Sequence, residues 1–193
     1  MVEGVRVLSF VIGGLAAGVV AGKALAAEPQ AFVLEPAQSE IHFTATQNGA
    51  EVKGEFTSFT APVLQFHPDA LADSKVVVEV ALGSVSMSYD EAVSTLQTPE
   101  WFNVDAFPTA RFETTAFSAT DEGSYLAEAN LRIKGKTVPV RLTFDINRFD
   151  EVGADVTGRT VLKRTDFGIG WDATDTVADA VPVTIHFTAK RAE

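Results

Sequence analysis

Apolar and polar side chains alternate along most of this chain, and this period of two constrains its fold more than any other feature. The clearest run extends from Val138 to Ile146 (VPVRLTFDI), where every second side chain is large and apolar. Successive side chains of a β-strand point to opposite faces, so such a run indicates a strand with one buried face. We therefore expect antiparallel strands that bury their apolar faces against one another. The same alternation is found at residues 41–45, 76–82, 125–134 and 181–188.

Turn-forming residues separate these runs. Asn48-Gly49 predicts a tight hairpin because both residues tolerate positive φ, and further turns are predicted at residues 67–69, 121–123 and 134–135. Strands of about ten residues favour a barrel over a sandwich, and a barrel also leaves no exposed strand edges. No linker interrupts residues 28–193. We predict a single all-β domain, an extended antiparallel β-barrel.

One segment, residues 88–96, is typical of a short helix. Ser88 is expected to cap this helix, while Asp90 and Glu91 lie in its first turn, where the helix dipole favours carboxylates. Pro99 is expected to end it. It is the one helix that we predict after the N-terminal segment.

The pentapeptide IHFTA occurs twice, at Ile41–Ala45 and at Ile185–Ala189. In a closed barrel the first and last strands are neighbours in the same surroundings, so these two strands are predicted to lie side by side. Chance similarity between two amphipathic strands is enough to explain why the five letters are identical.

The first 26 residues have the features of a secretory signal peptide. An apolar run from Val7 to Gly22 follows Arg6, and Ala24-Leu25-Ala26 forms an A-x-A cleavage site. We expect export to the periplasm, with mature protein beginning near Ala27 or Glu28. The alternative is that the segment is retained as an uncleaved membrane anchor.

The composition argues against several classes of function. The chain has no cysteine, which excludes disulfides, thiolate catalysis, thiolate metal sites and the lipid-bearing cysteine of a bacterial lipoprotein. Its net charge is −11, and it becomes −12 without the signal peptide. No run of Lys and Arg occurs in the sequence, so we expect no nucleic-acid partner. Phenylalanine contributes 14 residues against two Trp and two Tyr, which suits a dry interior.

The chain lacks the common catalytic motifs. Neither a Gly-x-Ser-x-Gly elbow nor a His-Glu-x-x-His pattern occurs, and the carboxylates fall mainly on predicted outward faces and turns. Asp166-Phe167-Gly168 matches the kinase triplet, but the Gly-rich phosphate loop and the catalytic-loop signature of that class are missing. We predict that the protein is not an enzyme and needs no cofactor.

Two groups of polar residues are candidate sites. His42 and His186 fall on the polar faces of two strands and are interpreted, like His67, as solvated surface residues. A metal pair is the weaker alternative, because no carboxylate or third histidine stands at ligand spacing in the sequence. Arg164 and Asp166 would share a face of an extended segment, so we expect a structural ion pair; the alternative is a polar cap on a ligand head group.

Three segments resemble the YceI-like family, bacterial periplasmic proteins that bind polyisoprenoids. Residues 101–112 (WFNVDAFPTARF) are similar to the aromatic pair, "yP" turn and "F" strand of that family. Residues 131–140 (LRIKGKTVPV) and 164–169 (RTDFGI) are similar to its "LtirGvtrpv" hairpin and "R-dFGi" segment, and residues 54–66 to its early hairpin. The resemblance runs from about residue 32 to residue 189, and the order and spacing of the motifs carry it.

The resemblance implies that residues 27–193 form a lipocalin-like barrel with a hydrophobic tunnel for a long isoprenoid or fatty chain. Ala45-Thr46-Gln47 is similar to members found beside b-type quinol-oxidising membrane cytochromes. A quinone tail is therefore one candidate ligand, and such a cytochrome is a candidate functional partner. Residues 35–39 and 66–68 depart from the family pattern, which questions head-group contacts more than the fold. The sequence does not fix the oligomeric state, and a homodimer is among the options.

The inward side chains of the predicted strands are the candidates for lipid contact. Periodicity alone does not distinguish a lipid tunnel from a packed core, since a small barrel can hold either. We predict a periplasmic carrier of an amphiphilic isoprenoid-type lipid. The alternative is a non-catalytic structural or interaction barrel with a solid core and no bound lipid, for example an accessory of a quinol-oxidising cytochrome. The tunnel candidates are Phe43, Phe56, Val78, Val80, Trp101, Phe102, Phe112, Leu131, Phe144 and Phe187.

Overall fold

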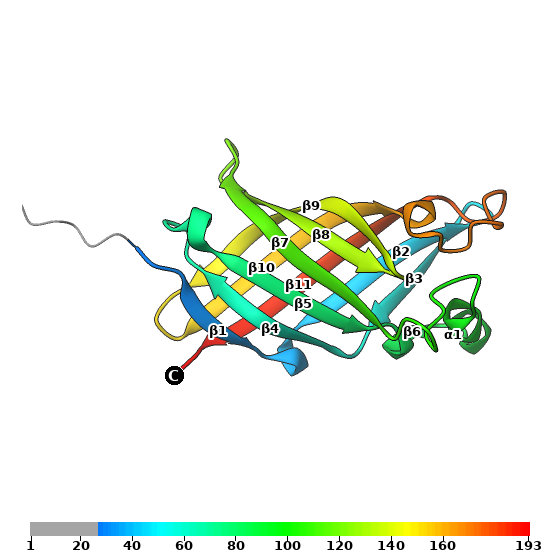
Figure 1. The fold of residues 1–193 in the computed structure, drawn as a ribbon, viewed down its shortest axis with the longest axis horizontal. Helices are drawn as coiled ribbons and strands as arrows, with labels where there is room; N and C mark the ends of the chain where they lie inside the picture. Colours follow the sequence, from blue (N-terminus) through cyan, green and yellow to red (C-terminus); the bar gives the residue numbers. More distant parts are fainter. Residues whose placement is uncertain (1–26) are drawn as a thin grey trace, which may run out of the picture.

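The structure, a computed structural model, describes residues 27–193, and the predicted signal peptide lies outside the described residues. Eleven antiparallel strands form one sheet that curls into an elongated barrel (Figure 1). The all-β barrel predicted from the alternation is confirmed. The strands are β1 (Gln30–Leu34), β2 (Glu40–Gln47), β3 (Ala50–Phe56), β4 (Phe59–Phe66), β5 (Lys75–Ala81), β6 (Val85–Met87), β7 (Thr109–Ala119), β8 (Tyr125–Ile133), β9 (Lys136–Phe149), β10 (Gly153–Lys163) and β11 (Ala180–Arg191).

Eight of these strands close the barrel, in the order β1-β4-β5-β7-β8-β9-β10-β11 and back to β1. Strand β11 is shared between two neighbours. Its C-terminal half pairs with β1, where Leu34 lies opposite Ala189, and its N-terminal half pairs with β2, where Ile41 lies opposite Ile185. Strands β2, β3 and β6 therefore extend the wall beyond β1. The two IHFTA strands are neighbours, as predicted, and their first residues face each other directly.

Two hairpins turn on pairs of residues with positive φ. Asn48 and Gly49 (φ 50° and 81°) join β2 to β3, and Lys134 and Gly135 (φ 49° and 76°) join β8 to β9. Positive φ at both central residues matches the twist of the flanking strands, and glycine adopts it without steric cost. Both turns were predicted from the sequence.

Helix α1 (Asp90–Gln97) begins two residues later than predicted. Tyr89 occupies the N-cap position and no side chain caps the helix, so the predicted capping role of Ser88 was wrong. Ser88 lies instead in the bend that follows β6. The two carboxylates of the first turn lie where they were predicted, and the helix ends just before Pro99.

The other helical segments of residues 27–193 are four short 3-10 turns. Among the described residues, no helix combines the length and apolar character needed to cross a membrane. The turns are η1 (Pro36–Gln38), η2 (Leu71–Asp73), η3 (Leu82–Ser84) and η4 (Arg164–Phe167).

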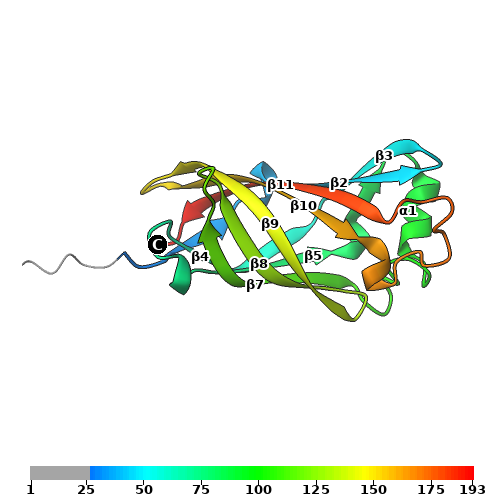
Figure 2. The same ribbon diagram turned by 90° about the horizontal axis from the view of Figure 1, so that it is seen from above.

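The buried side chains form three clusters along the barrel. One cluster, which includes Phe102 and Phe167, lies beside α1. A second includes Ile41, and a third contains Phe66 and Phe144. Figure 2 shows α1 at one end of the long axis and the C-terminus near the other. The interior is therefore elongated, and its two ends are built from different residues.

Candidate functional site

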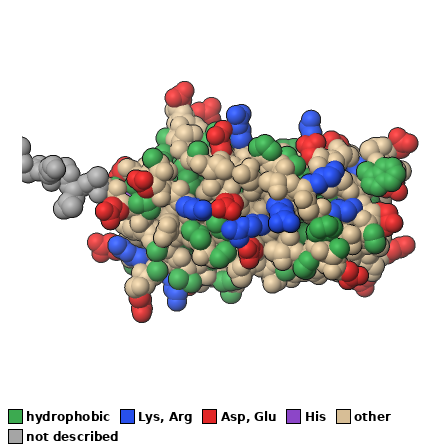
Figure 3. Space-filling view, viewed as in Figure 1, with side chains coloured by type: hydrophobic (Ala, Val, Ile, Leu, Met, Phe, Trp, Pro, Cys, Tyr) green, Lys and Arg blue, Asp and Glu red, His purple; other side chains and the backbone are tan. Residues whose placement is uncertain are grey.

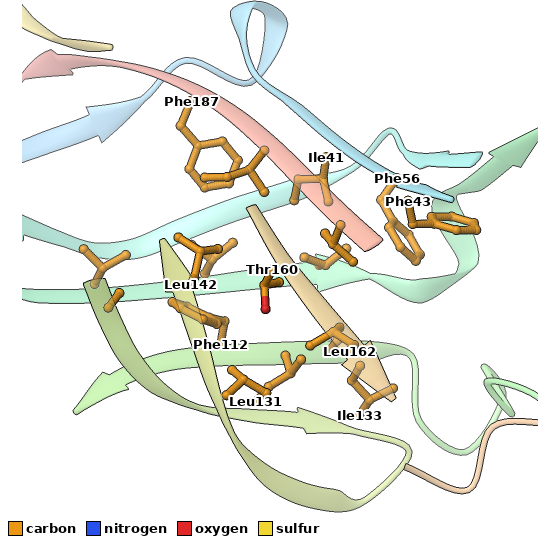
Figure 4. A pocket seen from close by; sticks show the side chains of 18 of the residues that line it. Ile41, Phe43, Phe56, Phe112, Leu131, Ile133, Leu142, Thr160, Leu162 and Phe187 are labelled. Atoms are coloured by element: carbon orange, nitrogen blue, oxygen red, sulfur yellow. The ribbon is translucent and has the colours of Figure 1, made fainter. Parts of the chain in front are cut away.

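A cavity of about 300 Å³ lies inside the barrel (Figure 4). Its wall is apolar except for Thr114, Thr160 and Arg164. The Thr114 hydroxyl exchanges hydrogen bonds with the backbone of Val76 at 2.9 and 3.2 Å, and Thr160 donates to the carbonyl of Arg141 at 2.7 Å. Both hydroxyls are therefore engaged within the wall, which presents a hydrocarbon-like surface to any occupant.

All ten tunnel candidates predicted from the sequence line this cavity. Eight lie on strands, whereas Trp101 and Phe102 lie in the loop that follows α1. Phe43 and Leu131 point inward yet remain half-buried, because they border the cavity rather than other side chains. That these residues contact a lipid stays a prediction.

Sequence reasoning missed lining residues that fall outside the clear alternation. Thr160 and Leu162 of β10 line the cavity, but Gly158 occupies the same inward phase and interrupts the apolar pattern. Ile169 and Val177 line it from the loop after η4, where strand periodicity gives no signal.

Aromatic rings close the end of the cavity that lies away from α1. Phe66 is at their centre, with ring centroids 5.4 Å from Phe117, 6.0 Å from Tyr125, 5.8 Å from Phe144 and 6.2 Å from Phe149. All four contacts are edge-to-face, the arrangement that the ring quadrupoles favour. This end is held together by packing.

The end beside α1 is closed around the ring of Trp101. The guanidinium carbon of Arg164 lies over this ring, 5.8 Å from its centroid. The backbone of Gly170 lies on the ring so closely that a Cβ there would be 2.8 Å from it. Gly170 also donates its N–H to the carbonyl of Glu100 at 2.9 Å. Cation–π attraction and a backbone hydrogen bond thus fix the indole in place.

Arg164 is buried, with only 4% of its surface exposed. Its guanidinium donates hydrogen bonds to the backbone carbonyls of Ile169, Gly170, Val177 and Ala178. The Gly170 carbonyl also accepts from the Ala173 N–H at 3.1 Å, but the other three depend on Arg164, and losing a partner is costly for a buried acceptor. Arg164 therefore organises the whole loop that follows η4.

The predicted ion pair between Arg164 and Asp166 was wrong. The segment folds as the 3-10 helix η4 rather than as an extended strand, so residues two apart no longer share a face. Four of the five N–H donors of the guanidinium serve backbone carbonyls. If Arg164 capped a ligand head group, only its fifth N–H would remain to donate a hydrogen bond to that group.

Lys134 joins the two loops at this end. Its Nζ donates to the carbonyls of Glu100 at 3.1 Å and Gly168 at 3.0 Å. Desolvation by burial is the main reason that the pKa of Lys134 is lowered. Directional hydrogen bonds from two cations thus supplement packing at the α1 end.

The histidines have carboxylate neighbours that the sequence did not reveal. His42 Nε2 lies 3.0 Å from Glu40 Oε2, and His186 Nε2 lies 2.8 Å from Asp155 Oδ2. Both rings are partly exposed on the outer face. Within residues 27–193, no group of three His, Cys, Asp or Glu side chains is arranged to hold a metal ion.

A closed antiparallel barrel around an apolar cavity defines a lipocalin-like barrel protein. More specifically, the YceI-like domain family matches residues 32–189, and the chain belongs to that family. A UPF0312 protein of Azotobacter vinelandii is 33% identical over 107 residues, which cover 51% of this chain and 54% of that protein. One from Shewanella denitrificans is 26% identical over 142 residues, which cover 70% and 74%.

Solved structures share the architecture. BcnA of Burkholderia cenocepacia gives a TM-score of 0.75 at 23% identity and covers 80% of this chain and 98% of its own. A polyisoprenoid binding domain from Saccharophagus degradans, implicated in plant cell wall breakdown, gives 0.68 at 12% identity, with 84% and 99% covered. The YceI protein of Campylobacter jejuni gives 0.68 at 23% identity, with 75% and 87% covered. At these identities the likeness concerns the fold.

Proposed function

We propose that this protein is an exported, non-catalytic carrier that holds the chain of an isoprenoid-type lipid inside its barrel. The observation that carries the proposal is the cavity of about 300 Å³, whose wall is apolar except for three side chains that already have backbone partners. Such a wall favours hydrocarbon over any ligand that must bury polar groups. A solid-core structural barrel, the alternative function, would not leave such a space.

The comparisons support a lipid rather than another apolar ligand. The Saccharophagus degradans neighbour is described as a polyisoprenoid binding domain, and it spans nearly the same fold. Membership in the YceI-like family points the same way. A polyprenyl chain or a quinone tail fits this chemistry, because either one presents only hydrocarbon to the wall.

The remaining parts of the proposal concern cellular context. Export to the periplasm rests on residues 1–26, and N-terminal sequencing of native protein should find mature chains that begin near Ala27. An intact Met1 in a membrane fraction would instead support a retained anchor. A functional link to a b-type cytochrome and a homodimer belong to the same proposal, and co-purification and sedimentation from native membranes would test them.

Lipid extraction tests the central claim. Protein purified from its native compartment should carry a prenyl lipid that mass spectrometry identifies. Added prenyl alcohols or quinones should raise the melting temperature by mass action. At a ligand concentration 100 times Kd, the free energy of unfolding should rise by about 2.7 kcal/mol. A protein that carries no lipid and shows no shift with isoprenoids, quinones or fatty acids would contradict the carrier function. Turnover of the ligand would contradict its non-catalytic part.

A further inference from the structure

The barrel wall is not hydrogen-bonded along its full length. The ladder between β9 and β10 begins at the pair Phe149 and Ala154 and ends at the pair Thr143 and Arg159, although both strands continue toward the α1 end. Beyond that point residues 136–142 of β9 pair with β8, and residues 160–163 of β10 pair with β11. Figure 2 shows the two strands diverging there. We call these two stretches, 136–142 and 160–163, the seam.

The cavity reaches the seam from inside. Val140 and Leu142 line it from β9, and Thr160 and Leu162 line it from β10. Figure 4 shows Thr160 between Leu142 and Leu162. The hydrogen bond from Thr160 Oγ1 to the carbonyl of Arg141, 2.7 Å long, crosses the seam. Parting the wall here therefore breaks side-chain contacts and one side-chain hydrogen bond, whereas parting β10 from β11 would break an uninterrupted backbone ladder.

Cations flank the seam on the outside. Arg141 on β9 and Arg159 on β10 point outward, with side chains 75% and 66% exposed. Their carboxylate contacts, to Glu128 at 3.4 Å and Asp145 at 3.7 Å, are solvent-exposed and weak. Lys163 follows in the same outward phase of β10. The neighbouring face of β5, β7 and β8, which Figure 3 shows, carries Lys and Arg interspersed with Asp and Glu. In a chain of net charge −11, the fold has gathered cations that are dispersed in the sequence.

Side chains occupy both ends of the cavity. The rings around Phe66 fill one end, and Trp101 fills the other under the hydrogen bonds of Arg164 and Lys134. The buried charge of Arg164 is already directed at four backbone carbonyls. At the seam, a ligand with a hydrocarbon chain and an anionic head group can place its chain in the apolar cavity and its head group beside the exposed cations.

We propose that the seam is the lateral portal of the cavity, and that Arg141 and Arg159 bind the anionic, phosphate-type head group of an amphiphile whose chain lies inside. The proposal rests on the carrier function and adds to it the head-group class and the route of uptake. A phosphate would be too costly to desolvate inside the apolar cavity. At the surface, guanidinium groups give it charge-assisted hydrogen bonds while water still solvates it.

Two ligands with the same prenyl chain test the head-group site, one ending in a phosphate and one in a hydroxyl. The double variant Arg141→Gln/Arg159→Gln should bind the prenyl phosphate roughly tenfold more weakly at low salt and bind the alcohol as before. The loss should shrink at high ionic strength because the pairs are exposed. The matched control, Lys53→Gln/Arg148→Gln, removes the same charge from exposed positions outside the seam and should bind both ligands normally.

Each other outcome separates this proposal from the carrier function. If wild-type protein binds both ligands but the seam variant weakens neither, or weakens both equally, the head-group site is overturned and the carrier function stands. If inorganic pyrophosphate competes as well as the prenyl phosphate, the arginines form a general anion site and the amphiphile assignment falls. If wild-type protein binds neither ligand, the carrier function itself fails.

Cross-linking tests the portal, and the chain has no native cysteine to interfere. Pro139→Cys and Val161→Cys place exposed thiols on opposite sides of the seam. A short bis-maleimide between them should slow lipid exchange at least tenfold. The control is Val161→Cys with Pro182→Cys, a directly opposed pair in the intact β10–β11 ladder, whose cross-link should leave exchange unchanged. Equal exchange in both cross-linked proteins would exclude the seam as the route.

Discussion

At the end of the cavity away from α1, four aromatic side chains meet around Phe66 and are held by packing. At the α1 end, Trp101 is held by a buried guanidinium and by backbone hydrogen bonds that Arg164 and Lys134 organise. The ring contacts are individually weak dispersion and quadrupole interactions, and a shift of one ring leaves no polar group unsatisfied. In a buried hydrogen-bond network, by contrast, displacing one donor such as Arg164 leaves several backbone carbonyls without a partner at the same time. We infer that the α1 end is the rigid end, and that the aromatic end adapts to chains of different length.

The largest effect is expected at the rigid end. Arg164→Met should cost about 3–5 kcal/mol, because it leaves the carbonyls of Ile169, Val177 and Ala178 without their donor. Urea unfolding measures this free energy. Lys163→Met, at an exposed neighbouring position, is the control and should change stability by less than about 0.5 kcal/mol. An Arg164 variant as stable as the control would show that this end does not depend on the network.

A smaller loss of stability is expected from Phe144→Ala at the aromatic end. A fully packed phenylalanine costs about 3–5 kcal/mol on truncation, but Phe144 partly borders the cavity, so we expect about 2–3 kcal/mol. The variant should fold and retain lipid poorly, and Phe144→Asp should abolish retention because a charge beside hydrocarbon is unsolvated. Urea unfolding and lipid content after gel filtration measure the two effects. Outright unfolding, together with wild-type protein that never carries lipid, would mean that the interior is only a core.

Gly170→Ala tests whether the indole of Trp101 is fixed by contact. Both Gly170 and Gly123 have positive φ (53° and 86°), so alanine is strained at either position by about 1 kcal/mol. Only at Gly170 would the new Cβ meet a ring, at 2.8 Å, whereas nothing lies within 4 Å at Gly123. We therefore expect about 2 kcal/mol for Gly170→Ala and about 1 kcal/mol for Gly123→Ala. Equal losses in thermal unfolding would mean that Trp101 moves aside freely.

The sequence predicted the aromatic end better than the α1 end. Phe144 stands in a nine-residue alternation, and period two alone assigns such a side chain to the interior. Arg164 lies in a segment without periodicity, and its partners are backbone carbonyls of Ile169 to Ala178, which carry no residue-type signal. The seam also escaped prediction, because Arg141 and Arg159 are distant in sequence and only the register brings them to one face. Strand phase is local information, whereas closure and register are not.

The smallest effect concerns Asp179, which fastens η4 at the rigid end. Its Oδ1 accepts hydrogen bonds from the Thr165 backbone N–H at 3.0 Å and the Thr165 hydroxyl at 2.7 Å. The Thr165 side chain is the main cause that lowers the pKa of Asp179 below its usual value, followed by the Thr165 backbone. The folded state thus favours the ionised form, so this stabilisation is present above the pKa of the unfolded chain and is lost as pH falls through the lowered folded value.

Asp179→Asn keeps an acceptor oxygen and removes the charge, so it should cost about 0.5–1 kcal/mol at pH 7. The difference from wild type should be smaller at pH 3, below the usual pKa of an aspartate, and should disappear as pH falls through the lowered folded value. Urea unfolding at the two pH values measures the gap, with Asp172→Asn, an exposed carboxylate of the same loop, as the control for charge. A gap that stayed constant with pH would show that the geometry of the acceptor matters and its ionisation does not. The α1 end would then be held by Arg164 and Lys134 without help from a carboxylate, which would sharpen its contrast with the aromatic end.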